Sequence, residues 1–377
     1  MNPTRPCPAW SRRGFLKCVG AGALGMAAGP TPDAVAAGSP RRAVSLQPVM
    51  ATPRFPGRVV EVFSGDVLDA NAVRQDVVDR MIERGLGELT GASDLAAAWK
   101  LFVGPQDVVG LKVNTLSGPG CSTRREVVDG VIRGLRLAGV PDANIIIWDR
   151  FESHLRRARY PIAQRPGALR CYATDSPTAG EDMDVYYEAD VLDLIPEHLR
   201  KDPSRGYAAS YPNSHFSKIF TEHITKQINL PVLKDHNITG LTLALKNVAF
   251  GICGNTERFH PTPINCDPMI AEVCAHPMVQ SKTVLTIADC LTLLYEGGPM
   301  VDPQNLLPYR SLLVGTDMVA SDTVGLDILE RIRGEKGLRS LWKTSTPPKY
   351  LNSAAALHLG VGEMEAVDRV RITMPAV

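Results

Sequence analysis

The sequence predicts an α/β protein with a mostly parallel sheet and helices on both faces. Short apolar segments alternate along the chain with longer amphipathic ones. Strands of a parallel sheet are buried on both faces and are joined by helices, which produces this alternation. The chain has 377 residues, of which 44% are hydrophobic and 21% charged, so it is long enough for one large domain or two ordinary ones.

The elements follow from periodicity and from breaks at Gly and Pro. Strands are predicted at Arg58–Phe63, Asp107–Asn114, Asn144–Asp149, Thr283–Ile287, Ser311–Val314 and Arg369–Met374. Helices are predicted at Asn71–Leu89, Arg124–Ala138, Thr239–Phe250 and Met318–Arg333, with a capping box formed by Thr123 and Glu126. Residues 160–230 are expected to form loops with short elements. The α/β domain is predicted over residues 57–377, with 57–230 and 231–377 as two lobes.

Composition excludes several classes of function. The formal net charge of +1 argues against a polycationic nucleic-acid binder, and 6% aromatic residues argue against a platform for stacking bases. We therefore expect no nucleic-acid partner. The sequence contains no G-x-G-x-x-G, P-loop, H-E-x-x-H or G-x-S-x-G motif, so classical dinucleotide, nucleotide-hydrolase, zinc-protease and serine-hydrolase interpretations have no support.

Residues 1–37 read as an export signal of the twin-arginine type. Arg12 and Arg13 are followed by Phe-Leu-Lys, then by a Gly/Ala-rich apolar run and by Ala34-Val-Ala-Ala-Gly38. This order predicts a periplasmic or otherwise extracytoplasmic protein that meets the twin-arginine translocon; a short buried helix is the alternative. The apolar run is too short to span a bilayer, and no membrane span is expected in the mature chain. Residues 38–56 are expected to form an irregular linker.

Six cysteines lie beyond the signal, namely Cys121, Cys171, Cys253, Cys266, Cys274 and Cys290. None of their spacings is C-x-x-C, so we expect no iron–sulfur cluster of the ferredoxin type and no zinc ribbon. Buried thiols are expected, with one disulfide as the alternative.

The segment from Leu230 to Gly251 carries the sharpest chemical signal. If Thr239–Phe250 is a helix, no carboxylate lies three or four residues from Lys246. A lysine that is removed from water has a lowered pKa and can act as a nucleophile or covalent anchor, whereas the alternative is a lysine that extends its amine to solvent. Asp235 and His236 precede this helix and His260 follows it, so proton transfer or metal binding by the histidines is also predicted.

A second set of candidates lies at the end of a predicted strand. Lys112 and Asn114 are two residues apart and therefore share one side of the strand at its carboxyl end, where open α/β sheets bind ligands. The helix that follows could receive an anion at its N-terminal amides and at Arg124, although a solvated first turn is the alternative. Asp149 ends the next strand at the same edge. Asp317 is expected to cap a helix, and Asp322 to face the site.

The mature chain resembles, over nearly its whole length, the family called domain of unknown function 362. The residues that carry the resemblance are Val109–Asn114, Ile145–Asp149, Lys234–Asn247 and Gly315–Asp322. Some members of that family are fused to iron–sulfur modules, for which this chain lacks the cysteines. The family has no settled activity, so the resemblance implies a fold and a set of shared residues.

The chain also resembles, more distantly, lactate-racemase-type enzymes that carry a nickel-pincer nucleotide. That resemblance rests on His236, Lys246 and His260 in this order. It implies that Lys246 anchors the cofactor covalently, that His260 ligates nickel and that His236 moves the substrate proton. Before its lysine this chain has Leu243-Ala244-Leu245 in place of the glycine-glycine-arginine of those enzymes.

Together these observations predict an enzyme that acts on a small anionic substrate through a site of lysine and histidine. Such a site can hold a metal or a covalent cofactor. A non-catalytic envelope protein that binds an anion or a metal is the alternative. The expected catalytic residues are Lys246, His236, Lys112 and Asp235; the expected cofactor-binding residues are Lys246, Asn114, Arg124 and Asn247; and the expected metal ligands are His260 and His236.

Overall fold

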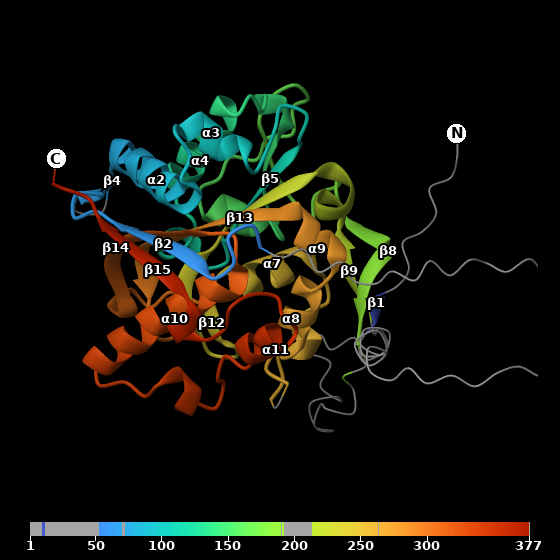
Figure 1. The fold of residues 1–377 in the computed structure, drawn as a ribbon. Coiled ribbons are helices and arrows are strands. Elements are labelled where there is room, and N and C mark those ends of the chain that lie inside the picture. The colour runs from blue at the N-terminus through green and yellow to red at the C-terminus, as the bar shows by residue number, and fades with distance from the viewer. Residues whose placement is uncertain are drawn as a thin grey trace, which may run out of the picture.

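The predicted α/β class is confirmed. A computed structural model describes residues 10–11, 53–69, 72–189, 191, 213–262 and 264–376. Its main sheet has ten strands, in the order β15-β2-β14-β13-β10-β5-β6-β7, with β11 paired to β13 and β12 to β11 (Figure 1). These strands are β2 (Arg58–Phe63), β5 (Val109–Val113), β6 (Ile145–Asp149), β7 (Arg170–Ala173), β10 (Lys226–Leu230), β11 (Val232–His236), β12 (Gly240–Thr242), β13 (Thr283–Leu294), β14 (Leu306–Gly315) and β15 (Asp368–Thr373).

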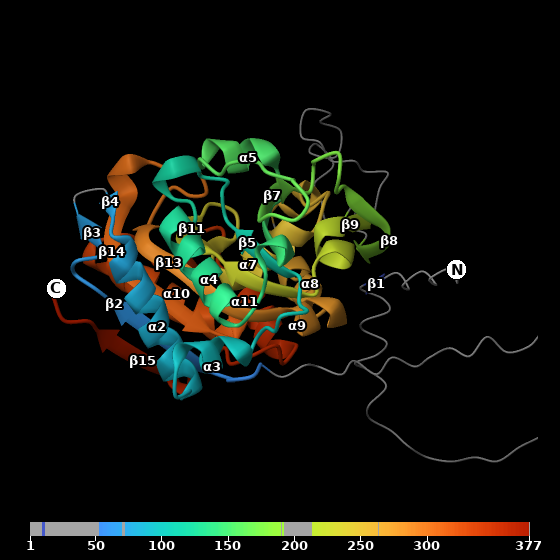
Figure 2. The same ribbon diagram turned by 90° about the horizontal axis from the view of Figure 1, so that it is seen from above.

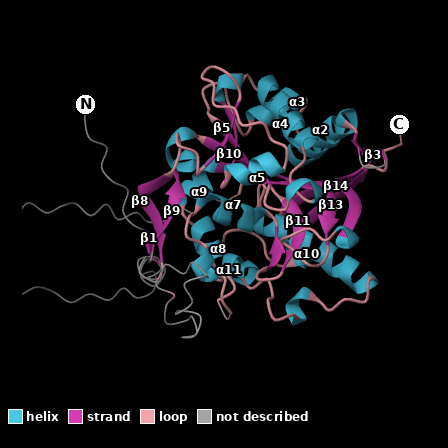
Figure 3. Cartoon of the chain, turned by 180° about the vertical axis from the view of Figure 1, so that it is seen from behind, coloured by secondary structure: helices cyan, strands magenta, loops and turns pink. Residues whose placement is uncertain are grey.

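The sheet is parallel from β13 to β7, and among its own described strands only β14 and β12 run antiparallel to their neighbours. Strands from both predicted lobes alternate within it, since β2 lies between β15 and β14. Two smaller sheets are formed by β3 (Leu68–Asp69) with β4 (Ala72–Val73), and by β1 (Trp10–Ser11), β8 (Glu181–Glu188) and β9 (Asn213–Ser217). The latter sheet stands beside the main one (Figure 3).

Helices cover both faces of the main sheet. One face carries α2 (Gln75–Thr90), α3 (Leu95–Lys100) and α4 (Arg125–Leu137), which lie over the sheet when it is seen from above (Figure 2). The other carries α7 (Ala244–Ile252), α8 (Met269–Cys274), α10 (Met318–Glu335) and α11 (Tyr350–Ala356). The remaining α-helices among the described residues are α5 (Glu152–Arg157) and α9 (Pro277–Lys282). Each face has its own apolar core, so the sheet separates two cores.

Two local predictions were wrong. The segment predicted as a helix from Thr239 begins as strand β12, which pairs with β11 in a hairpin, and α7 starts only at Ala244. Gly240 at φ 71° makes the close turn of this hairpin possible. The predicted capping box does not form either, because the N-cap of α4 is Arg124 and no side chain caps this helix. The Thr123 hydroxyl donates instead to the Leu230 carbonyl at 2.6 Å. That contact joins the start of α4 to the end of β10.

Several other expectations can be compared with the structure. Residues 160–230 contain β7, β8, β9, β10 and a π-helical turn at Ile219–His223, beside the loops that were expected. The six cysteines beyond the signal are buried and free in the described part of the chain. The predicted signal and linker fall almost wholly outside the described residues. No helix among the residues described is long and apolar enough to cross a membrane.

Candidate functional site

A cavity of about 330 Å³ opens at the carboxyl ends of β5 and β6, the edge at which α/β sheets bind ligands. Its wall combines apolar side chains with polar ones, and among the latter lysine and arginine outnumber aspartate and glutamate. The lining residues with polar or charged side chains are Lys112, Asn114, Thr115, Asp149, Arg150, His154, Lys234, His236, Thr242, Lys246, Asn247, Thr256, Glu257 and His260. The cavity therefore has an excess of basic side chains, which favours an anionic ligand.

Lys112 is held in a buried ion pair. Its side chain leaves the end of β5, is 1% exposed, and donates from Nζ to Asp149 Oδ1 at 2.8 Å and to the Val113 carbonyl at 2.6 Å. Burial raises the pKa of Asp149, but the Lys112 ammonium and hydrogen bonds from Thr115 outweigh it, so this pKa lies below its usual value. Asn247 accepts a third, longer hydrogen bond of 3.3 Å from Lys112. Lys112 thus has little donor capacity left for a ligand.

Gly251 makes room for Lys112. A Cβ atom at Gly251 would lie 1.9 Å from Lys112 Cε, so α7 can pass this close to β5 only without a side chain there. We expect Gly251→Ala to displace Lys112 and to destabilise the fold by about 1–3 kcal/mol, the usual cost of overpacking a filled core. Urea unfolding followed by circular dichroism measures this. Gly87→Ala serves as the control, because a Cβ atom there meets nothing within 4 Å. Equal stability of the two variants would contradict the close approach.

The β11–β12 hairpin brings a further lysine to the cavity. Lys234 and His236 are two residues apart on β11 and share one side of it, while Thr242 lies directly opposite Lys234 in the register of the hairpin. Lys234 is 1% exposed and donates to Asn114 Oδ1 at 2.8 Å and to Ser117 Oγ at 2.7 Å. Sequence reasoning missed Lys234 as a site residue. Lys234 and His236 are two residues apart on one strand, which is the same spacing that led to the prediction of Lys112 and Asn114.

Asn114 and Asn247 connect the two lysines. Asn247 Oδ1 accepts from Asn114 Nδ2 at 3.0 Å, and Asn114 Oδ1 accepts from Lys234. Asn247 Nδ2 in turn donates to Asn229 Oδ1 at 2.8 Å. In each asparagine both the amide oxygen and the amide nitrogen have a hydrogen-bond partner. These partners fix the orientation of both side-chain amides. Asn114 and Asn247, both predicted as ligand-binding residues, therefore line the cavity as its polar framework.

Lys246 lies on α7 and differs from the other two lysines. It is 6% exposed, and its amine makes no hydrogen bond or ion pair to any residue that the structure describes. It lies over the ring of Phe250, whose centroid is 4.7 Å from Nζ. Burial, together with the charge of Lys234, lowers the pKa of Lys246 to about 7. A large fraction of this amine is therefore neutral at neutral pH.

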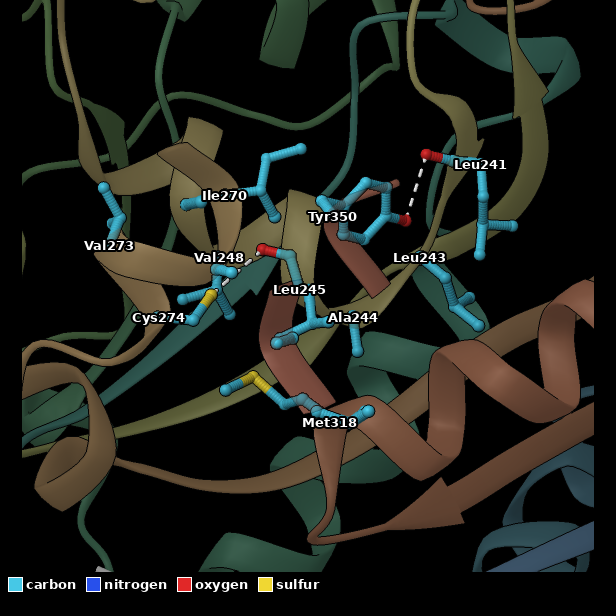
Figure 4. Close-up of a cluster of buried hydrophobic side chains, with 14 of the residues drawn as sticks. Leu241, Leu243, Ala244, Leu245, Val248, Ile270, Val273, Cys274, Met318 and Tyr350 are labelled. Atoms are coloured by element: carbon cyan, nitrogen blue, oxygen red, sulfur yellow. Dashed lines mark hydrogen bonds between the residues drawn. The ribbon is translucent and has the colours of Figure 1, made fainter. Parts of the chain in front are cut away.

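Helix α7 is fixed by its surroundings rather than by its own first turn. Leu243, Ala244 and Leu245 are fully buried among the residues of α8 and α11, and Leu245 accepts a hydrogen bond from Cys274 (Figure 4). Asp322, on α10, accepts hydrogen bonds from the amides of Ala244 and Leu245. Asp322 was expected to face the site, but its carboxylate instead caps the helix that carries Lys246. Burial raises the pKa of Asp322 to about 8.

Two of the three histidines that line the cavity, His236 and His260, are neutral at physiological pH. His236 Nδ1 accepts from the Ile238 amide at 3.1 Å, which leaves the proton on Nε2. Burial and the charge of Lys246 lower the pKa of His236 well below its usual value. His260 stacks on Phe250 with ring centroids 5.6 Å apart, and burial and Lys246 lower its pKa to about 4. Both histidines can therefore donate or accept a hydrogen bond without carrying charge.

Two predicted site residues lie away from the cavity. Arg124, at the start of α4, donates from its amide to Asp289 at 2.8 Å and from its guanidinium to Thr292, so the anion expected at this helix terminus is a carboxylate of the chain itself. Asp235 points to the other side of β11, where it accepts from the amides of Gly297 and Gly298. Asp317 caps α10 as predicted, by accepting from the Ala320 amide.

The residues present do not fit a metal held by protein side chains alone. Across the described ranges no three His, Cys, Asp or Glu side chains gather in a group that could hold a metal ion. At the cavity, His236 has one ring nitrogen occupied by the Ile238 amide, and His260 stacks on an aromatic ring.

The fold and the cavity define an α/β protein with a buried, lysine-rich site at the carboxyl edge of a parallel sheet. The chain belongs to the family described as "Domain of unknown function (DUF362)", whose match extends over residues 109–327, more than half of the chain but less than the near-complete coverage expected. A comparison with curated proteins gave no match.

Among solved structures, the chain is similar to a protein from Thermotoga maritima determined by the Northeast Structural Genomics Consortium. The TM-score is 0.39 and the sequences are 12% identical. The match covers 72% of this chain and 61% of the Thermotoga chain. The likeness is too distant to transfer residue roles.

Proposed function

We propose that the chain is an enzyme that acts on a small anionic substrate, with Lys246 as its nucleophile and His236 as the group that polarises or protonates the reacting atom. The observation that carries this proposal is the unpaired, buried amine of Lys246 inside a cavity with an excess of basic side chains. A neutral amine is a nucleophile, whereas an ammonium is not. A protein that only binds anions gains nothing from keeping a lysine uncharged.

Proton exchange tests this proposal across a range of substrate classes at once. The purified chain is incubated in heavy water with a panel of small oxo and hydroxy acids and phosphorylated carbonyl compounds, and exchange of carbon-bound hydrogen is followed by ¹H NMR. We expect exchange of at least one compound by the wild type. Lys100→Met, which changes an exposed lysine at the end of α3, is the control and is expected to retain it. Binding of a panel compound with no exchange of any would contradict catalysis.

A non-catalytic binding protein is the second candidate. It is favoured by Lys234, whose amine is already oriented by hydrogen bonds to Asn114 and Ser117 and needs no rearrangement to face an anion. A third case is that Lys246 anchors a cofactor covalently, as the resemblance to the enzymes with a nickel-pincer nucleotide implies. The intact mass of the protein from its native host separates these cases, because an anchored group adds its mass at Lys246 whereas a free amine does not.

We also propose that the chain is exported in folded form by the twin-arginine route. The support is the order of Arg12, Arg13, the apolar run and Ala34–Gly38 in the sequence. Replacing both Arg12 and Arg13 by lysine is expected to retain the protein in the cytoplasm, as measured by cell fractionation. Arg5→Lys is the control and is expected to leave export unchanged. Equal export of all three proteins would contradict this route.

A further inference from the structure

Lys234 is a buried lysine without a carboxylate partner, and burial lowers its pKa. Among the described residues its amine contacts only the neutral groups of Asn114 and Ser117, which leaves one of its three hydrogens unused. Lys112, by contrast, is paired with Asp149. Burying a charge without a counter-charge is costly, and a bound anion would offset that cost. Lys234 thus differs from Lys112 in having no counter-ion among the described residues.

Thr242 supplies a second unused donor beside Lys234. Its side chain is buried, lines the cavity, and its hydroxyl has no hydrogen-bond partner among the described residues. Thr242 and Lys234 are direct partners in the β11–β12 hairpin, so their side chains emerge side by side. A buried hydroxyl that is left unpaired costs stability unless a ligand satisfies it. Two adjacent donors, one of them charged, suit the two oxygens of a carboxylate.

The terminus of α7 is not available to an anion. Phosphate groups commonly bind at the free amides of a helix N-terminus. Here the amides of Ala244 and Leu245 are occupied by Asp322, and those at the start of α4 are occupied in part by Asp289. An anion here is therefore held by side chains, and the two adjacent donors of Lys234 and Thr242 match the two oxygens of a carboxylate.

We propose that the cavity takes a small oxo acid, whose carboxylate binds between Lys234 and Thr242 and whose carbonyl carbon is attacked by Lys246. This inference rests on the proposed nucleophilic role of Lys246. The amine nitrogen forms a bond to the carbonyl carbon, and the carbonyl oxygen leaves as water with the two hydrogens of the neutral amine, which gives an imine. His236 Nε2–H is the neutral donor that can polarise the carbonyl oxygen during the attack. No oxidant or reductant is needed.

Borohydride trapping tests this inference, because it reduces an imine to a stable amine. The full chain is incubated with pyruvate, with acetone as the neutral ketone of similar size, and with propionate as the acid without a keto group. Peptide mass spectrometry locates the product. We expect a pyruvate adduct at Lys246, much less adduct from acetone, none from propionate, and competition by propionate. Trapping of acetone as well as pyruvate would overturn the oxo-acid class while leaving Lys246 as the nucleophile.

Variants of the carboxylate subsite sharpen the test. Lys234→Met and Thr242→Val are expected to lower the ratio of pyruvate to acetone trapping by about 10- to 100-fold, as expected for the loss of a hydrogen bond to a charged group. Thr90→Val, on α2, is the control and is expected to retain the wild-type ratio. An unchanged ratio in both subsite variants would overturn the assignment of Lys234 and Thr242. Absence of any adduct at Lys246, with propionate still bound, would overturn the nucleophilic role itself.

Discussion

Replacing Lys246 by methionine is expected to abolish proton exchange and imine trapping, with a loss of about 10³-fold or more, as is usual when a nucleophile is removed. Methionine has a similar length and no amine. The fold should persist, because the Lys246 amine makes no hydrogen bond or ion pair within the described chain that the substitution would break. Rates are measured by ¹H NMR and stability by urea unfolding. Retained exchange in a folded variant would contradict the role of Lys246.

The same variant reports the ionisation of Lys246 through stability. The pKa of Lys246 is lowered from 10.5 to about 7 in the folded chain, so between these values the unfolded chain binds a proton that the folded chain lacks. The free energy of unfolding therefore rises with pH in this window, by at most about 1.4 kcal/mol per pH unit. Relative to Lys246→Met, the wild type should gain stability from about pH 7.5 to pH 10. A constant difference between the two proteins would contradict the lowered pKa.

Replacing Lys112 by methionine is expected to destabilise the fold by about 3–5 kcal/mol, because it leaves the buried carboxylate of Asp149 without its counter-charge. The pair is short, at 2.8 Å, and both side chains are shielded from solvent. Adding Asp149→Leu to Lys112→Met should recover part of the loss, since the uncompensated charge is then gone. Guanidinium unfolding of the three proteins measures this coupling.

An exposed ion pair provides the matched control for Lys112. Arg136 contacts Asp142 at the same distance of 2.8 Å, but both side chains are about half exposed. Solvent screens such a pair, so Arg136→Met is expected to cost less than about 1 kcal/mol. If Arg136→Met lowered the free energy of unfolding as much as Lys112→Met does, the importance of burial would be contradicted.

The sequence predicted those parts of the site that depend on local periodicity. Lys112 and Asn114 were placed at the cavity because alternate residues of a strand share one side and parallel strands end at one edge. The order of β5, α4 and β6 was predicted for the same reason. Lys246 was singled out by the absence of a nearby carboxylate on its helix.

The remaining parts depend on contacts between distant segments. The β11–β12 hairpin was missed because Lys-Asp-His-Asn has low strand propensity, and its pairing is decided by burial against β13 and α7. Lys234 was missed with it. Asp322 caps α7 from a position 78 residues away, and Asp289 occupies the amide of Arg124 from 165 residues away. Local patterns contain no information about such partners.

The most direct test of the proposed chemistry is the titration of the Lys246 amine itself. Lysine labelled with ¹³C at Cε is incorporated into the full chain, and the Lys246 signal is assigned by its loss in Lys246→Met. Its chemical shift is then followed from about pH 5 to pH 11, a range that spans the shifted and the ordinary lysine pKa. A midpoint near 7, far below the midpoints of the exposed lysines, is the expected result. A midpoint near 10.5 would show an ordinary ammonium group and would contradict the nucleophilic role.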